Sequence, residues 1–278
     1  MNTAGERWLS FHVFIQDALE PFLLGSLLPA VDRELAAGRL KRFFFIRYSE
    51  GGLHLRLRFL PARTMDATAT GNWLEEIVRK FDAEKALDSE PTVVQEQRYN
   101  RAELYFGETL DSVYAELLNE QTSYLSLRLL RAQCGSHGRL LVVLGCTLYL
   151  LVRSATGSTN DFVKSLKDSQ DFAARTLGEL GLSLNRVSND FEDKLLGSLS
   201  RALPVVAQQL EREPSLSRIS KLLQRTGRSG SSNGFVGTHA LHLLCNKTGF
   251  ALQDENHLFG ALRRLADSTS PRHTVKGD

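Results

Sequence analysis

The sequence predicts an α+β protein, with an antiparallel sheet or hairpin in the N-terminal third packed against a mostly helical remainder. Residues 53–60 (LHLRLRFL) alternate apolar and polar side chains with a period of two, which is typical of a half-buried strand. From residue 111 onward, apolar residues recur at the three- and four-residue spacings of amphipathic helices. Strands that precede the helices, instead of alternating with them, favour an antiparallel sheet.

The expected elements follow from the same two periods. Before residue 111 the strands are residues 8–15, 41–49, 53–60 and 92–100, and the turn SEGG joins the second and third as a hairpin. Helices are expected over residues 17–37, where Pro21 and Pro29 are candidate breaks, and over residues 72–87. The later helices are residues 111–133, 138–155, 160–180, 189–213, 215–225, 238–249 and 254–268.

Length and composition are those of a globular protein. The chain has 278 residues, of which 42% are hydrophobic and 24% charged. We expect one domain over residues 1–270 and a disordered tail over 271–278. The Gly/Ser stretch at residues 226–234 predicts a mobile loop, of the kind that often serves as a lid.

Several partner and cofactor classes find no support. A formal net charge of +2 indicates neither nucleic acid nor a membrane surface as a partner. The apolar run at residues 140–152 is shorter than the roughly 20 residues of a membrane span, so a buried helix is expected. Three cysteines (Cys134, Cys146 and Cys245) form no CxxC pair, and the histidines are scattered. We therefore expect buried, reduced thiols, no metal, no cofactor and, in the absence of a secretion signal, a cytoplasmic protein.

The hairpin carries the first candidate site. Alternation places His54, Arg56 and Arg58 on one strand face, and we expect Arg47 of the partner strand to join them. Cations held so close repel one another, so they pair with carboxylates or bind an anionic or carbonyl-rich ligand. The alternative is a solvated strand face.

Two further segments carry candidate residues. In the segment RYNRAELYFGE (residues 98–108), Tyr99 and Tyr105 are candidate general acids, and Arg101 is a candidate contact for a polar ligand. In the segment HALHLLCNK, His242 is a candidate proton carrier with Asn246 one helical turn later. The alternatives are packed aromatic side chains and a structural histidine.

Together these stretches resemble the thiopeptide-type bacteriocin biosynthesis family, which is similar to the C-terminal elimination domain of class I lantibiotic dehydratases. The block FFFIRYSEGGLHLRLRF (residues 43–59) is the most specific part, and the likeness covers most of the chain. The resemblance implies that Arg56 and Arg58 contact a glutamyl group on Ser or Thr of a precursor peptide. It also implies His242 as the acid or base that eliminates glutamate to leave a dehydroamino acid.

The sequence departs from the elimination pattern in two places. Where elimination domains resemble YxxExxRYGG, a gapless alignment places Ala102 at the glutamate and Tyr105 at the arginine. Lys247 likewise replaces the arginine that follows the helical histidine and asparagine. These replacements weaken the case for glutamate elimination.

The same family includes thiopeptide pyridine synthases. They join two dehydroalanines of one peptide by a formal [4+2] aza-cycloaddition, with loss of water and of the leader peptide. This chemistry needs proximity and acid–base help, for which His242, Tyr105 and Tyr99 have the right groups. The resemblance thus implies a pyridine synthase first, a freestanding glutamate-elimination lyase second, and a non-catalytic precursor-binding module third.

The partner implied is a ribosomally synthesised precursor peptide with a leader and a dehydrated core. We expect the leader to bind strand edges or the basic hairpin surface. Other biosynthetic enzymes are further expected partners, and a homodimer is left open.

Overall fold

The computed structural model describes residues 7–16, 18–62, 66–85, 90–100, 112–132, 136–156, 159–179, 189–227 and 233–269. Its contacts divide the chain into two compact units. Unit 1 is residues 1–107 and 111–127, and unit 2 is residues 108–110 and 128–278.

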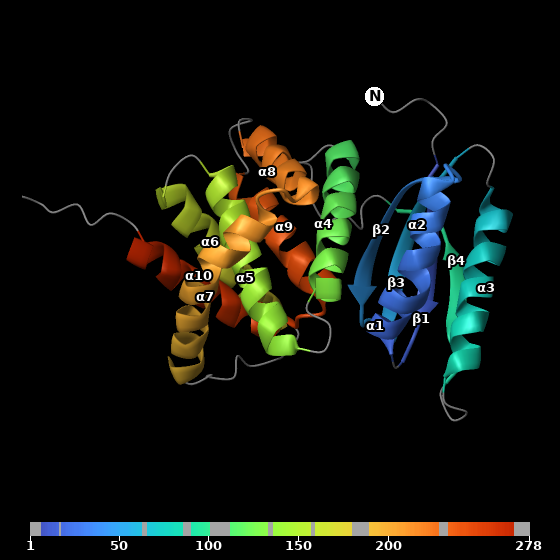
Figure 1. The fold of residues 1–278 in the computed structure, drawn as a ribbon, viewed down its shortest axis with the longest axis horizontal. Helices are drawn as coiled ribbons and strands as arrows, with labels where there is room; N and C mark the ends of the chain where they lie inside the picture. The colour runs from blue at the N-terminus through green and yellow to red at the C-terminus, as the bar shows by residue number, and fades with distance from the viewer. Residues whose placement is uncertain are drawn as a thin grey trace, which may run out of the picture. The chain divides into compact units, whose positions relative to one another are not determined.

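Unit 1 contains a four-stranded antiparallel sheet in the order β2-β3-β1-β4 (Figure 1). The strands are β1 (Leu9–Phe14), β2 (Leu40–Tyr48), β3 (His54–Pro61) and β4 (Val93–Gln97). The hairpin of β2 and β3 turns through Gly51 and Gly52, whose positive φ angles of 77° and 108° favour glycine. All four expected strands are confirmed to within a few residues.

One face of this sheet is apolar and packs against helices of unit 1. Phe59 of β3 meets Trp73 of α3 (Ala67–Glu84) edge-on, at 5.4 Å between ring centroids. Asp66 caps α3, since its carboxylate accepts a hydrogen bond from the Ala69 N–H at 2.8 Å. A second contact, between Phe22 and Phe81 at 5.1 Å, joins α3 to the helical segment that follows β1.

That segment stays helical across both prolines. It consists of α1 (Leu19–Pro21), the π-helix η1 (Phe22–Leu27) and α2 (Leu28–Ala36). Pro29 lies in the first turn of α2, where a missing N–H is tolerated, so the expected break becomes a change of helical pitch.

The long helix α4 (Ser112–Ala132) borders the sheet with its residues up to 127, which belong to unit 1. The Ser123 hydroxyl accepts a hydrogen bond from the Phe45 N–H at 3.1 Å, while it donates to the Asn119 carbonyl of α4 at 2.8 Å and lies 3.4 Å from the Phe45 carbonyl. Because β2 is an edge strand, Ser123 satisfies backbone groups that no neighbouring strand reaches.

Unit 2 is helical in all its described elements. These are α5 (His137–Ala155), α6 (Thr159–Glu179), α7 (Asn189–Leu210), α8 (Pro214–Gly227), α9 (Asn233–Thr248) and α10 (Leu252–Thr269). The central helix is α5, which contacts the five others. By length and composition α5 is also apolar enough to cross a membrane. However, 56% of its most apolar 18-residue stretch is buried inside the protein, as in many core helices.

The α+β class is confirmed. Cys146 and Cys245 are buried free thiols, and burial raises the pKa of Cys146 to about 12. Residues 226–227 and 233–234 of the expected loop are helical, whereas residues 228–232, the tail at 271–278 and Cys134 lie outside the described residues.

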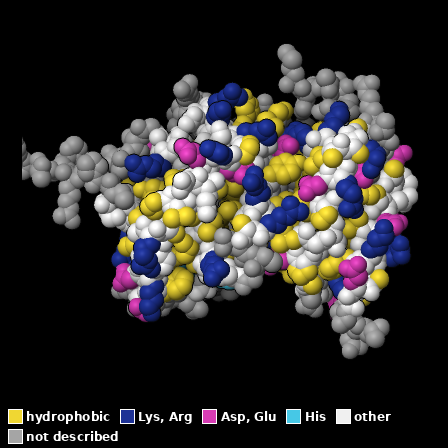
Figure 2. Space-filling view, in the orientation of Figure 1, with side chains coloured by type: hydrophobic (Ala, Val, Ile, Leu, Met, Phe, Trp, Pro, Cys, Tyr) yellow, Lys and Arg dark blue, Asp and Glu magenta, His cyan; other side chains and the backbone are white. Residues whose placement is uncertain are grey.

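On the face shown in Figure 2, basic side chains are spread among acidic and apolar ones.

Gly145 marks the tightest packing around α5. A methyl group there would approach Leu199 Cδ2 to 2.6 Å and Leu258 Cδ1 to 2.8 Å, and both leucines are fully buried. We expect Gly145→Ala to lower the free energy of unfolding by about 1–3 kcal/mol, measured by urea titration. The control Gly178→Ala on α6, with nothing within 4 Å, should leave stability unchanged or slightly raised. Equal stabilities of the two variants would contradict this packing.

Candidate functional site

The register of unit 1 builds a polar cluster on the sheet face opposite the apolar one. His12 of β1 lies directly opposite Arg56 of β3, and Phe14 lies opposite His54. On the neighbouring strand β2, Tyr48 lies directly opposite His54. Side chains paired in this way share one face, so the predicted alignment of His54, Arg56 and Arg58 is confirmed. We call the sheet face that carries Ser10, His12, Tyr48, His54, Arg56 and Arg58 the arginine face.

His54 is held in one neutral tautomer by its two hydrogen bonds. Its Nδ1 lies 2.8 Å from the Gly52 carbonyl, which can only accept, so Nδ1 carries the proton. Its Nε2 lies 3.3 Å from Arg56 Nε, which can only donate, so Nε2 is unprotonated. Burial, with Arg56 and Arg58, lowers the pKa of His54, although the hydrogen bond to Gly52 opposes the shift.

His12 is kept neutral more strongly. Burial, followed by the charges of Arg58 and Arg56, lowers the pKa of His12 to about 4. Its ring lies 5.1 Å from that of His54, in a stacked arrangement. At neutral pH His12 is therefore an uncharged hydrogen-bonding group beside two permanent cations.

Aromatic rings and a carboxylate accompany the arginines. The Arg56 guanidinium lies 3.4 Å from the centre of the Tyr48 ring, and Arg58 lies 5.6 Å from that of Tyr99. The Tyr99 hydroxyl donates a hydrogen bond to Glu116 of α4 at 3.2 Å. The candidate acid Tyr99 thus lies at the arginine face, with its hydroxyl directed at the Glu116 carboxylate.

An ion pair lies on the same side of the sheet, at β2. Arg42 donates to Glu120 of α4 at 2.6 Å, and its guanidinium lies 5.1 Å from the Trp8 ring. Both side chains are mostly buried, so this pair carries little exposed charge.

Arg47 does not join this group. It pairs in register with Leu55, so it lies on the apolar face and forms an ion pair with Glu20 at 3.0 Å. The expectation that it gathers with Arg56 and Arg58 was wrong, because a shift of one residue along a strand reverses the face. Its predicted contact with substrate has no support from this placement.

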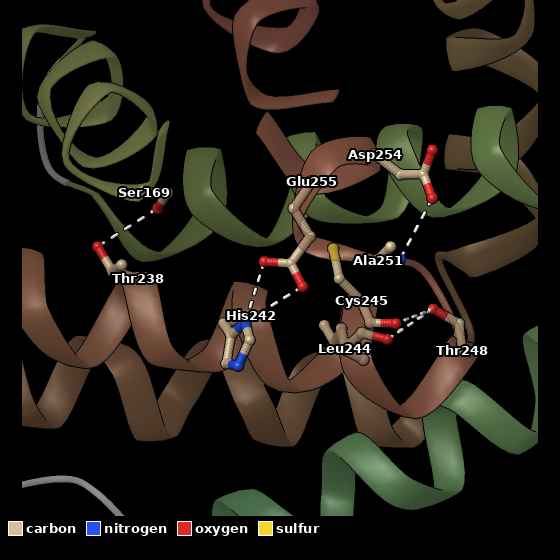
Figure 3. Close-up of polar contacts among 9 residues, drawn as sticks. All are labelled: Ser169, Thr238, His242, Leu244, Cys245, Thr248, Ala251, Asp254 and Glu255. Atoms are coloured by element: carbon tan, nitrogen blue, oxygen red, sulfur yellow. Dashed lines mark hydrogen bonds and ion pairs between the residues drawn. The ribbon is translucent and has the colours of Figure 1, made fainter. Parts of the chain in front are cut away.

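The helical histidine in unit 2 has a buried carboxylate partner. His242 of α9 lies with Nδ1 at 2.9 and 3.1 Å from the two carboxylate oxygens of Glu255 on α10 (Figure 3). Glu255 is 1% exposed, whereas the side chain of His242 is 28% exposed. The second ring nitrogen of His242, Nε2, points away from Glu255 in this view. Because Nδ1 donates to Glu255, Nε2 is the nitrogen that gains or loses a proton when the ring titrates.

Burial and the carboxylate act in opposite directions on this pair. Burial lowers the pKa of His242, but Glu255 outweighs it by charge and hydrogen bonding, so the pKa lies above the ordinary value. Burial raises the pKa of Glu255, and the imidazole opposes that shift. The dyad resembles the carboxylate–imidazole pairs in which the carboxylate orients the imidazole and stabilises its protonated form.

Two more residues of the HALHLLCNK segment follow the histidine along α9. Asn246 lies one helical turn after His242 and is half-buried. Lys247 is fully buried, and burial lowers its pKa well below the ordinary value. Within the described part of the chain, no group of three or more His, Cys, Asp or Glu side chains is arranged to hold a metal ion.

Some predicted residues lie outside the described ranges, and some functional residues were not predicted. Tyr105, Arg101 and Ala102 lie in residues 101–111, which the structure does not describe. Glu255 was missed, although an acidic residue in the first turn of the helix after His242 was a usable signal. His12 was missed because its neighbours depend on the pairing of β1 with β3 across more than 40 residues, which no local pattern records.

Comparisons with known proteins agree with this fold. The sequence model of the lantibiotic biosynthesis dehydratase C-terminal domain matches residues 8–266. No curated protein matches the chain. A crystal structure of TsrL is similar at TM-score 0.61 and 16% identity, over 96% of this chain and 95% of that one.

Two other solved structures share the fold. The pyridine synthase TbtD from thiomuracin biosynthesis is similar at TM-score 0.54 and 17% identity, over 95% of this chain and 99% of that one. The tRNA-dependent lantibiotic dehydratase MibB from Microbispora sp. 107891 is similar at TM-score 0.63 and 19% identity, over 96% of this chain. The chain spans 29% of the length of MibB.

The lowered pKa of His12 predicts a pH dependence of stability. Between pH 6.5 and about 4, His12 is protonated in the unfolded chain but neutral in the folded chain. The free energy of unfolding therefore falls as the pH falls through this range. His12→Phe should lose less stability than the wild type between pH 7 and pH 5, measured by urea titration at both values. His137→Phe, at an exposed position of α5, is the control. An unchanged pH dependence in His12→Phe would contradict the assignment.

Proposed function

The chain belongs to the family of lantibiotic biosynthesis dehydratase C-terminal domains, and from this membership we propose that it modifies a ribosomally made precursor peptide. The finer proposal is a pyridine synthase, which joins two dehydroalanines by a formal [4+2] aza-cycloaddition. The observation that carries this choice is the replacement of the elimination pattern's glutamate and arginine by Ala102 and Tyr105. The pyridine synthase TbtD has the same fold over nearly its whole length.

The chemistry divides into steps that ordinary side chains assist. One dehydroalanine and its preceding amide must tautomerise to an imidic acid, which moves a proton from the amide nitrogen to the carbonyl oxygen. Two carbon–carbon bonds then close the six-membered ring against the second dehydroalanine. Loss of water from the former amide carbon and of the leader as its amide leaves the pyridine. Each step needs proton transfer, and ring closure needs the two alkenes held together.

We assign proton transfer to His242 and its orientation to Glu255. With Nδ1 bonded to Glu255, Nε2 gives a proton to a departing oxygen or nitrogen when the imidazole is charged, and takes one when it is neutral. A pKa above the ordinary value increases the charged fraction at neutral pH relative to an ordinary histidine, which suits the acid role.

We assign the carbonyl oxygens of the peptide to Arg56 and Arg58. Guanidinium groups donate to carbonyl and carboxylate oxygens, and the developing negative charge of an imidic oxygen strengthens such bonds. Tyr99 is the neighbouring acid, paired with Glu116.

The alternative is a freestanding glutamate-elimination lyase. The same Arg56 and Arg58 suit the carboxylate of a glutamyl ester, and His242 suits removal of the proton on the carbon next to the carbonyl. A non-catalytic binding module is the third candidate. For every candidate we propose a leader-bearing precursor as partner, and a leader deletion that left binding unchanged would contradict leader recognition.

Mass spectrometry of a Ser-rich, dehydrated, leader-bearing precursor incubated with the purified protein separates these candidates. Pyridine formation predicts a free leader amide and a core lighter by one water, with a pyridine absorbance. An unchanged dehydrated precursor, together with loss of glutamate from a glutamylated one, would instead establish the lyase. Reaction of neither would leave the binding module.

His242→Phe should lower the rate of product formation by about 10²–10⁴-fold, the usual contribution of a general acid or base. Its control, His137→Phe, should react like the wild type. A His242→Phe rate within a factor of a few of the wild type would remove His242 from the mechanism.

Glu255→Gln tests the dyad separately. The amide leaves Nδ1 hydrogen-bonded but removes the charge that raises the pKa of His242. The midpoint of the pH–rate profile that reports the imidazolium should therefore shift to lower pH. A purely structural Glu255 would change the rate without moving that midpoint.

A further inference from the structure

Two polar atoms of β1 are buried on the arginine face without a hydrogen-bond partner. They are Ser10 Oγ and His12 Nε2, and neither has a partner within the part of the chain that the structure describes. Ser10 is 1% exposed. Ser10 lies directly opposite Arg58 in register, and His12 directly opposite Arg56. The Cβ atoms of Ser10 and His12 therefore lie beside those of Arg58 and Arg56, at the spacing of cross-strand neighbours.

Such atoms are costly in a folded protein. A buried hydroxyl or imidazole nitrogen without a partner loses its hydrogen bonds to water and gains nothing in return. Valine or phenylalanine would fill the same strand positions without this loss. Unsatisfied groups side by side on a candidate binding face are therefore best explained by a ligand that completes them.

The neighbouring charges determine what kind of ligand group fits. Arg56 and Arg58 offer only donors, so they bind oxygens. The imidazole of His12 is neutral, and cations on the facing strand favour the tautomer that presents a lone pair at Nε2 over one that presents an N–H. His12 therefore offers an acceptor beside the donors of Arg56 and Arg58. This arrangement matches a ligand with an N–H group beside a carbonyl or carboxylate.

We propose that Ser10 and His12 are substrate-binding residues, with His12 Nε2 accepting a hydrogen bond from a peptide N–H whose adjacent oxygen atoms bind Arg56, Arg58 and the Ser10 hydroxyl. This deepens the proposed function, on which it rests, because the amide whose tautomerisation starts the ring closure has this pair of groups. Since an imidazole with so low a pKa is a weak base, His12 orients the amide and does not deprotonate it.

A pair of small probes tests the contact without any reaction. N-acetylglycine carries one N–H beside a carboxylate, and N-acetylsarcosine replaces that hydrogen by a methyl group. We expect the wild type to bind N-acetylglycine more tightly by about two- to tenfold, the effect of one hydrogen bond, in titrations followed by NMR. In His12→Phe this preference should disappear, whereas His12→Gln, which keeps an acceptor, should retain part of it.

Other variants separate the contact from a loss of folding. Ser10→Ala and Arg56→Gln should weaken both probes alike and leave their ratio unchanged, and His137→Phe should change nothing. Equal affinities of the wild type for the two probes, no binding of either, or a preserved ratio in His12→Phe would overturn the proposal. These affinities do not depend on turnover, so failure of the cycloaddition assay alone would leave them as expected.

Discussion

Two guanidinium groups on one face of the sheet, that of Arg58 buried and that of Arg56 half-buried, determine most of what surrounds them. Arg58 is 2% exposed, so its charge is not dissipated into water. Such a group needs rings over its plane and acceptors at its edges, and Tyr48, Tyr99 and the Leu57 carbonyl supply them for the two arginines. Burial, together with the same positive field, makes a charged histidine unfavourable nearby, so the pKa values of His12 and His54 are both lowered.

The two units tune their histidines in opposite directions. On the sheet, arginines and burial lower the pKa values, while on α9 the Glu255 carboxylate raises that of His242. Titratable groups whose environments separate their pKa values are the usual means by which an enzyme assigns acid, base and binding roles. Here the division suggests hydrogen-bonding groups of constant charge on the sheet and a proton-exchanging group on the helix. A peptide with many amides and few charges suits the first, and successive losses of water and amide suit the second.

The sequence predicted what depends on local periodicity and left open what depends on distant pairing. The alternation in residues 53–60 placed Arg56 and Arg58 on one face, and helical spacing placed His242 and Asn246 one turn apart. Arg47 was assigned to the wrong face because only the register of β2 against β3 decides it. β1 lies inside the sheet, between β3 and β4. No short stretch of sequence predicts this pairing, so the neighbours of Ser10 and His12 could not be predicted. Glu255 reaches His242 across the connection between α9 and α10, a contact that no periodicity within either helix predicts.

The central claim is that these histidines differ in charge because of their neighbours, and ¹⁵N NMR of histidine-labelled protein between pH 4.5 and 8 tests it directly. Ring nitrogen shifts report both the protonation state and the tautomer of each imidazole. The account predicts that His12 remains neutral down to about pH 5 and that His54 titrates below the ordinary value, with its proton on Nδ1. It also predicts that His242 titrates above the ordinary value of about 6.5. Titration of His12 near pH 6.5, or of His242 below it, would contradict the account.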